Sequence, residues 1–267
     1  DWRLTLAATL ITGVTLAGCS QGPEDTASPS ATSEPAESSQ SEASSGKAHP
    51  VTGEPLAEEQ VFTYRALDES SSLDPQLVED VDGSYIVRDL FEGLMNEDIK
   101  GGLIPGAATG YTLSDDKLTY TFNLRDAKWS NGETVTAQDF VYAWRRLVDP
   151  KTASEYAWYM ELMGVKNASK VVKGTVPPDQ LGVRAVDDKM FEVTLENALP
   201  YFASMTVHGS TFPVLQSVVE KHGANWTKPG NMVGNGAYVL TEYRPGEKVV
   251  RERNPLYWDN ENTIIDK

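Results

Sequence analysis

The stretch LTYTFNLRDAKWSNGETVTAQDFVYAWRRL, residues 118–147, decides the fold class of this chain. From Leu118 to Leu124, apolar side chains alternate with polar ones, and this period of two predicts a strand with one buried face. Asn131-Gly132 is a strong turn signal, because both residues tolerate the backbone angles of a tight turn. We therefore expect the strand to be followed by a turn before residue 135.

The second part of the stretch has the pattern of a helix. Thr136 predicts the N-cap, with Asp139 at the third helical position in place of the usual Glu. Apolar residues then recur at i, i+3, i+4 and i+7, namely Phe140, Ala143, Trp144 and Leu147. Asp149-Pro150 ends the helix. The stretch therefore predicts a half-buried strand, a turn and an amphipathic helix in this order.

Further elements are predicted on both sides of this stretch. Residues 61–65 are predicted to form a strand and residues 72–75 a turn. Residues 86–94 have helical spacing, with Ile86, Leu90 and Leu94 on one face. Two hairpins are expected, one of 181–186 with 190–195 and one of 238–243 with 248–252.

Composition excludes several classes of function. Asp and Glu number 39 against 23 Lys and Arg, so the 267-residue chain has a formal charge of −16. This charge repels phosphate backbones, and we expect no nucleic-acid partner. One cysteine allows no internal disulfide, and three scattered histidines predict no metal site; no cofactor is expected.

The N-terminal region has the pattern of an export signal. Residues 4–16 form an apolar run, shorter than the roughly 20 residues that span a bilayer. The run ends in Leu16-Ala17-Gly18-Cys19, which resembles a bacterial lipobox and implies cleavage before Cys19 and lipid attachment to its sulfur. The alternative is a buried structural cysteine in a short helix. Residues 20–57 are rich in Ser, Pro and Glu, and we expect a disordered tether.

Several sequence blocks, in this order and spacing, resemble the bacterial oligopeptide-binding lipoproteins, which are extracytoplasmic solute-binding proteins of family 5. The blocks are residues 72–75, 88–94, 120–133, 135–144, 181–183, 200–202, 235–238 and 254–259. The resemblance implies a two-lobed α/β fold of the type II periplasmic-binding-protein class. Family members are about twice as long, so the chain is expected to hold part of the first lobe (59–91 and 216–267) and an additional subdomain (92–215), without the second lobe.

The resemblance also implies which residues meet the ligand. Glu79, Asp80 and Val81 match the family's edge that pairs with the peptide main chain, and Tyr156 matches a tyrosine that faces the ligand. Glu155 stands where the family commonly has proline, which puts the backbone there in doubt. The alternatives are an exposed acidic loop for Glu79 and Asp80, and ordinary packing for Tyr156.

Other aromatic and histidine residues are expected to be structural. The tryptophans at 129, 144, 226 and 258 are predicted to pack in the core or at the hinge. His208 beside Gly209-Ser210 could be read as a base and a nucleophile, but no Gly-x-Ser-x-Gly elbow is present.

The function implied by the resemblance is capture of oligopeptides outside the cytoplasmic membrane. Closure of the lobes around the peptide would precede delivery to the permease and ATPase subunits of an ABC importer. A monomer held to the membrane by a lipid anchor is expected, and no enzymatic activity. Two alternatives stay open: the same fold binding a dipeptide, nickel, haem or a sugar, and a lipid-anchored hydrolase.

Overall fold

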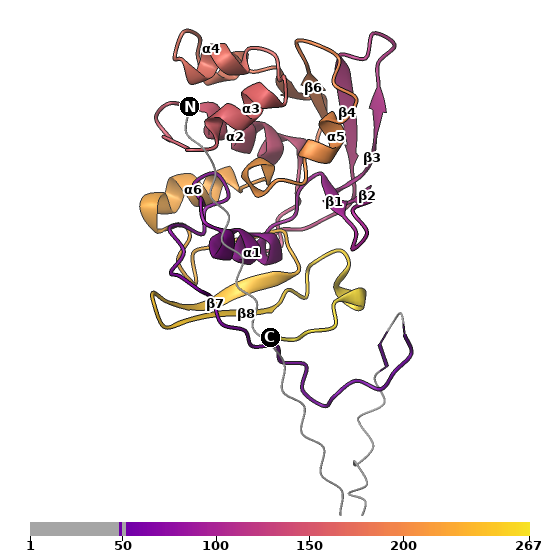
Figure 1. The fold of residues 1–267 in the computed structure, drawn as a ribbon, viewed down its shortest axis with the longest axis vertical. Helices are drawn as coiled ribbons and strands as arrows, with labels where there is room; N and C mark the ends of the chain where they lie inside the picture. The colour runs from indigo at the N-terminus through magenta and orange to yellow at the C-terminus, as the bar shows by residue number, and fades with distance from the viewer. Residues whose placement is uncertain (1–47, 50–51) are drawn as a thin grey trace, which may run out of the picture. The chain divides into compact units, whose positions relative to one another are not determined.

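The computed structural model describes residues 48–49 and 52–267 (Figure 1). The predicted signal peptide, Cys19 and most of the predicted tether lie outside these residues. Among the described helices, none has the length and apolar character that crossing a membrane requires.

A four-stranded antiparallel sheet forms one layer, in the order β3-β4-β6-β5. Its strands are β3 (Ala108–Leu113), β4 (Thr119–Leu124), β5 (Val183–Ala185) and β6 (Met190–Thr194). Side chains of β4 alternate between buried and less buried positions, and Phe122 lies opposite Phe191 of β6. The strand predicted over 118–124 and the hairpin of 181–195 are both confirmed.

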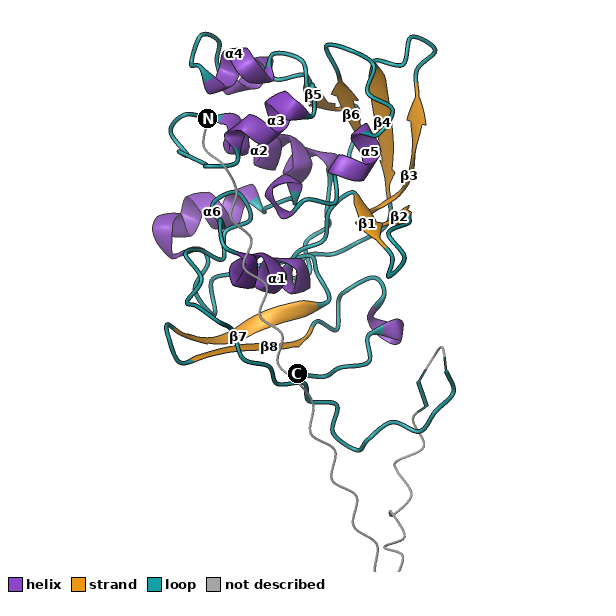
Figure 2. Cartoon of the chain, in the orientation of Figure 1, coloured by secondary structure: helices purple, strands orange, loops and turns teal. Residues whose placement is uncertain are grey.

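Helix α2 (Ala137–Val148) packs against the buried face of this sheet. Its Trp144 meets Phe191 edge to face, with ring centroids 5.1 Å apart. Thr136 is the N-cap, and its backbone N–H donates to the Asp139 carboxylate at 2.8 Å, so the predicted helix start is confirmed. Figure 2 shows the short helices that accompany α2 in this layer; they are α3 (Ala157–Leu162), α4 (Ala168–Val172) and α5 (Phe202–Met205).

A second layer contains helix α1 and a separate hairpin. Its elements are α1 (Val81–Leu90), β7 (Tyr238–Arg244) and β8 (Lys248–Arg253), while α6 (Gln216–His222) contacts α2. The hairpin predicted over 238–252 is confirmed. The backbone of Gly236 lies against the end of α1, where an added Cβ would come within 2.6 Å of the Asp89 carbonyl oxygen. This close approach requires glycine.

The connections complete the described chain. A small hairpin joins β1 (Met95–Glu97) to β2 (Leu103–Pro105). Single 3₁₀ turns are η1 (Pro178–Gln180), η2 (Gly209–Thr211), η3 (Gly223–Asn225) and η4 (Asn260–Asn262). The four tryptophans at 129, 144, 226 and 258 pack against the hydrophobic core, as predicted.

Two secondary-structure predictions are wrong. The helix predicted over 86–94 ends at Leu90, because the Leu90 carbonyl accepts from the Gly236 N–H and the Glu92 N–H donates to Asn235. These long-range bonds replace the next helical turn. Residues 61–65 are irregular, with Phe62 65% exposed. Their pattern suits a strand, but the recorded backbone bond in this segment is a single one, from Phe62 N–H to the Lys267 carbonyl.

The division into part of a first lobe (59–91 with 216–267) and a subdomain (92–215) stays a prediction. Figure 1 shows α1, β7 and β8 gathered at one end of the described region and the four-stranded sheet toward the other. Glu92, where the chain passes from α1 toward that sheet, is 4% exposed. Its carboxylate accepts bonds from Tyr257, Trp258 and Asn96.

Candidate functional site

The candidate site begins at the turn that leads into α1. Asp80 is the N-cap of this helix, and its carboxylate accepts from the backbone N–H of Gly83 at 2.6 Å and of Ser71 at 2.8 Å. Burial alone would raise the pKa of Asp80, but these backbone bonds and the Ser71 and Ser70 hydroxyls outweigh it, so the pKa is lowered. The Asp80 side chain is therefore fully used in fixing the entry to α1.

A buried ion pair between Asp74 and Arg146 stabilises the chain just before this turn. Asp74 is 2% exposed, and both of its oxygens bond the guanidinium of Arg146 from α2, at 2.8 and 2.5 Å. The indole N–H of Trp226 donates to the same carboxylate at 3.0 Å. A bidentate pair with further hydrogen-bond donors has the geometry that a buried carboxylate needs.

Gln76 brings three distant segments together. Its side chain is completely buried, and its amide N–H donates to the carbonyls of Phe212 at 3.0 Å and Ser210 at 3.3 Å. The backbone carbonyl of Gln76 accepts from the Ser154 hydroxyl at 2.5 Å. Gln76, Ser154 and residues 210–212 are thereby placed beside one another.

An aromatic surface lies where these segments meet. We call Tyr156, Trp158, Tyr159 and His208 the aromatic strip. The His208 ring lies 4.9 Å from Tyr156 and 4.5 Å from Tyr159, measured between centroids. Trp158 lies 6.1 Å from Tyr156 and is 51% exposed. The strip thus has a partly open aromatic surface on a well-anchored base.

His208 has a structural role in the strip. Its Nδ1 lies 2.8 Å from the Ser210 hydroxyl and accepts from the Ser210 backbone N–H. Burial lowers the pKa of His208, and the positive charge of Arg88 lowers it further, so the neutral ring is favoured. Ser210 is 1% exposed, so its hydroxyl cannot reach a substrate as a nucleophile. This geometry argues against His208 and Ser210 as a catalytic base and nucleophile.

Of the residues predicted from the sequence, Tyr156 lies in this strip, whereas Glu79, Asp80 and Val81 lie at the start of α1. Tyr156 is partly buried, with its backbone N–H donating to the Ser154 hydroxyl at 3.1 Å. Glu79 is exposed, and Val81 is 67% exposed. Asp80 has extended backbone angles, and Val81 is the first residue of α1. Their role in ligand binding stays a prediction.

Sequence reasoning missed the residues beneath the site. Gln76, Arg146 and Ser154 position it, yet Gln76 and Arg146 lie 70 residues apart in sequence. The available signal was weak: Asp74 is the one charged residue of the turn 72–75, and Arg146 lies in the last turn of α2. Neither position identifies the other without the fold.

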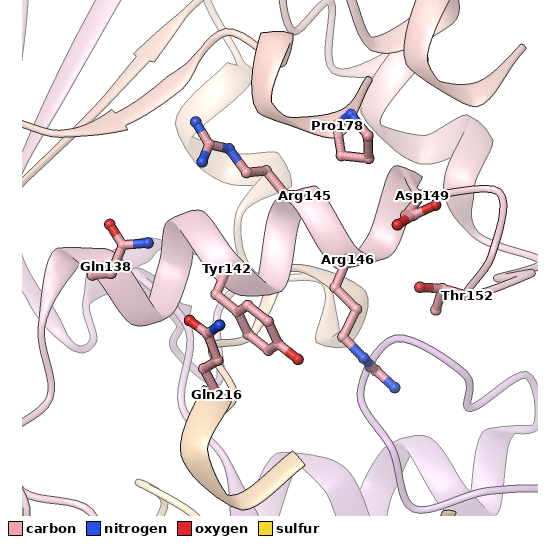
Figure 3. Close-up of a pocket in the computed structure, with 8 residues that line it drawn as sticks. All are labelled: Gln138, Tyr142, Arg145, Arg146, Asp149, Thr152, Pro178 and Gln216. Carbon is pink, nitrogen blue, oxygen red and sulfur yellow. The ribbon is translucent and has the colours of Figure 1, made fainter. Parts of the chain in front are cut away.

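A polar pocket of about 380 Å³ lies along α2, apart from the aromatic strip (Figure 3). Figure 3 shows Arg145 and Arg146 pointing in opposite directions from the helix. Arg146 is committed to Asp74, and Arg145 donates to the Asp179 carbonyl at 3.2 Å. The pocket has few apolar walls and lacks the residues predicted for binding, so it is the weaker candidate. Within residues 48–49 and 52–267, no cluster of His, Cys, Asp and Glu could hold a metal ion.

Comparisons with known proteins point to one family. Residues 102–267 match the model described as bacterial extracellular solute-binding proteins, family 5 middle. The chain is 48% identical over 217 residues to the periplasmic murein peptide-binding protein MppA of Escherichia coli, covering 81% of this chain and 40% of that protein. It is 43% identical over 214 residues to the probable deoxycholate-binding periplasmic protein YgiS of the same organism, covering 80% and 40%.

A solved structure with a bound peptide is also similar. Haemophilus influenzae OppA in complex with RPPGFSPFR matches with a TM-score of 0.73 and 48% identity, covering 74% of this chain and 39% of that one. The chain therefore spans about 40% of the length of the relatives that it matches.

Proposed function

The chain belongs to the bacterial extracellular solute-binding proteins of family 5, and we propose that it is the ligand-contacting first part of an oligopeptide receptor. The fold class predicted from the sequence, part of an α/β type II periplasmic-binding-protein fold, is confirmed by the likeness to solved members. The family consists of binding proteins, and we infer that this chain too releases its ligand chemically unchanged.

One observation carries the proposal. The predicted ligand-facing Tyr156 and the predicted main-chain partner segment 79–81 both adjoin segments that the buried side chain and carbonyl of Gln76 tie together. A receptor for varied peptides needs such an arrangement, because extended backbone recognises the peptide main chain while open aromatic surface accepts different side chains. The anchoring below the site keeps both parts in a fixed relation before ligand arrives.

The proposed mechanism is capture by closure. A peptide would first meet the aromatic strip and residues 79–81, and a second lobe would then close over it, since contacts to both lobes stabilise the closed form. Preorganisation of the first surface lowers the conformational cost of binding. Chemistry on the peptide is not part of this mechanism, in keeping with the burial of Ser210.

We further propose the setting in which the receptor works. It would act outside the cytoplasmic membrane as a monomer, held by a lipid on Cys19, and pass peptides to the permease and ATPase subunits of an ABC importer. The lipobox-like Leu16-Ala17-Gly18-Cys19 supports the anchor, and the similarity to the substrate-binding domain of an oligopeptide ABC transporter from Bacillus anthracis supports the importer. Metabolic labelling with a radioactive fatty acid, lost in Cys19→Ala, tests the anchor.

A second ligand class is favoured by one comparison. Because the chain is similar to a probable deoxycholate-binding protein, its ligand in this alternative is an apolar steroid acid and not a peptide. Mass spectrometry of ligands released by gentle denaturation of the full-length protein separates the two. A mixture of short peptides supports the proposal; a single steroid acid, with no peptide present, contradicts it.

A further inference from the structure

Trp158 is a large aromatic residue that the fold leaves half uncovered. Trp158 is 51% exposed, yet its indole contacts Tyr156 and meets Tyr159 edge to face at 5.9 Å between ring centroids. Tyr159 is itself fixed, because its hydroxyl donates to the Met205 carbonyl at 3.0 Å. Trp158 is therefore an exposed side chain on a fixed support and not a loose surface residue.

The exposed surface continues along α3. Leu162 lies four residues after Trp158, so the two side chains share a face of the helix, and Leu162 is 55% exposed. This apolar surface is continuous with Tyr156 through the ring contact between Trp158 and Tyr156. A ligand side chain that passes Tyr156 would therefore meet Trp158 next.

The charges around the strip differ between its two ends. Glu155 is exposed just before α3, and Glu161 is partly buried three residues after Trp158. No salt bridge to either carboxylate is recorded within the part of the chain that the structure describes. At the other end, the positive charge of Arg88 acts on His208. The Trp158 end is thus the acidic one.

We propose that Trp158, Leu162 and the carboxylates of Glu155 and Glu161 form a subsite for a basic side chain of the bound peptide. The face of an indole attracts a cation through its quadrupole, and the aliphatic part of lysine or arginine covers apolar surface while its charged end stays near carboxylates and water. This subsite rests on the proposed peptide-binding function and adds a side-chain preference to it.

Calorimetric titration of the full-length protein tests this subsite. The probes are alanine tetrapeptides that carry lysine, or its uncharged analogue norleucine, at each position in turn. At one position the lysine peptide should bind about three- to tenfold more tightly than the norleucine peptide, the range expected for a partly desolvated cation–π contact. The preference should weaken with added salt, since the carboxylates are near the solvent.

Variants assign the preference to Trp158. Trp158→Ala should remove the preference for lysine, and Trp158→Phe should keep part of it. Phe62→Ala, which changes an exposed aromatic residue in the irregular segment before α1, is the matched control and should leave the preference unchanged. Thermal unfolding confirms that each variant is folded.

Two results would overturn the subsite while leaving the proposed function intact. One is equal affinity for lysine and norleucine at every position, or tighter binding of norleucine. The other is a lysine preference that persists undiminished in Trp158→Ala. If no tetrapeptide binds at all, the proposed function itself is wrong and the subsite with it.

Discussion

The carboxylate of Glu92 accepts a hydrogen bond from the hydroxyl of Tyr257 at 2.7 Å, across 165 residues of sequence. Its other oxygen accepts from the Trp258 indole at 2.7 Å, and the guanidinium carbon of Arg125 lies 3.4 Å above the Trp258 ring centroid. This cluster ties the end of the described chain to the point where it leaves α1. Because the carboxylate is buried, we expect the cluster to contribute to stability in a pH-dependent way.

Glu92→Gln should destabilise the fold, and more strongly at acid pH. Burial raises the pKa of Glu92 above 4.5, and the bonds from Tyr257 and Trp258 only partly oppose this shift. Protonation is thus easier in the folded state, so this group's contribution is fully present below about pH 4.5 and is lost as the pH rises through the folded-state pKa. The amide cannot accept from both donors, which costs about 1–3 kcal/mol.

Urea unfolding of both proteins at pH 4 and pH 7 measures this effect. The difference in unfolding free energy between wild type and Glu92→Gln should be larger at pH 4. If this difference in unfolding free energy is the same at both pH values, or is larger at pH 7, the pKa of Glu92 is not raised in the folded state.

Arg146→Met should destabilise the protein by about 3 kcal/mol, since it leaves the buried Asp74 carboxylate without its cation. Arg184→Met is the matched control, because Arg184 pairs with Glu192 but is 66% exposed, and such pairs contribute less than about 1 kcal/mol. Equilibrium urea denaturation of each variant gives the comparison. If both variants lose the same unfolding free energy, the Asp74–Arg146 pair does not anchor the site.

Gly236→Ala should cost about 1–3 kcal/mol of unfolding free energy, because the new methyl would meet the backbone at the end of α1 at 2.6 Å. Gly209→Ala provides the comparison, since its methyl would lie 3.8 Å from Val87, an ordinary contact. Thermal denaturation followed by circular dichroism ranks the two. A smaller loss for Gly236→Ala than for Gly209→Ala would contradict the tight packing between α1 and residues 234–237.

Tyr156→Ala should weaken peptide binding by about tenfold or more in the full-length protein, since it removes an aromatic surface at the centre of the strip. Tyr156→Phe keeps the ring and should bind within about threefold of wild type. Calorimetry with one peptide measures both affinities, and unfolding curves verify that Tyr156→Ala is folded. If Tyr156→Ala binds the peptide as tightly as wild type, Tyr156 does not contact the ligand.

Local patterns predicted the local elements well. The alternation of apolar and polar residues over 118–124 predicts β4. The start and end of α2 are predicted by Thr136 and by Asp149-Pro150. Each of these signals acts within a few residues. Where a distant segment competes, the same reasoning fails. Apolar spacing over 86–94 continues past Leu90, but bonds to Asn235 and Gly236 end the helix there.

The sequence predicted a surface residue of the candidate site but not the buried residues that support it. Tyr156 was identified through family resemblance, and the structure places it in the aromatic strip with His208. The support below it depends on bonds between residues 70 or more positions apart, such as those from Gln76 to Arg146 and Phe212. Sequence spacing carries no information about such pairs. Exposure, which marks Trp158 as a surface aromatic, likewise needs the fold.

One titration tests most directly the proposal that the full-length protein binds a peptide by its main chain. Full-length protein is titrated calorimetrically with a tetrapeptide and with the same peptide methylated on one central backbone nitrogen. Removing a donor from strand-like pairing should weaken binding about tenfold at one position or more, while exchanging the neighbouring side chain changes affinity less. Equal affinity for every methylated analogue, or binding of deoxycholate with no response to any peptide, would contradict the account.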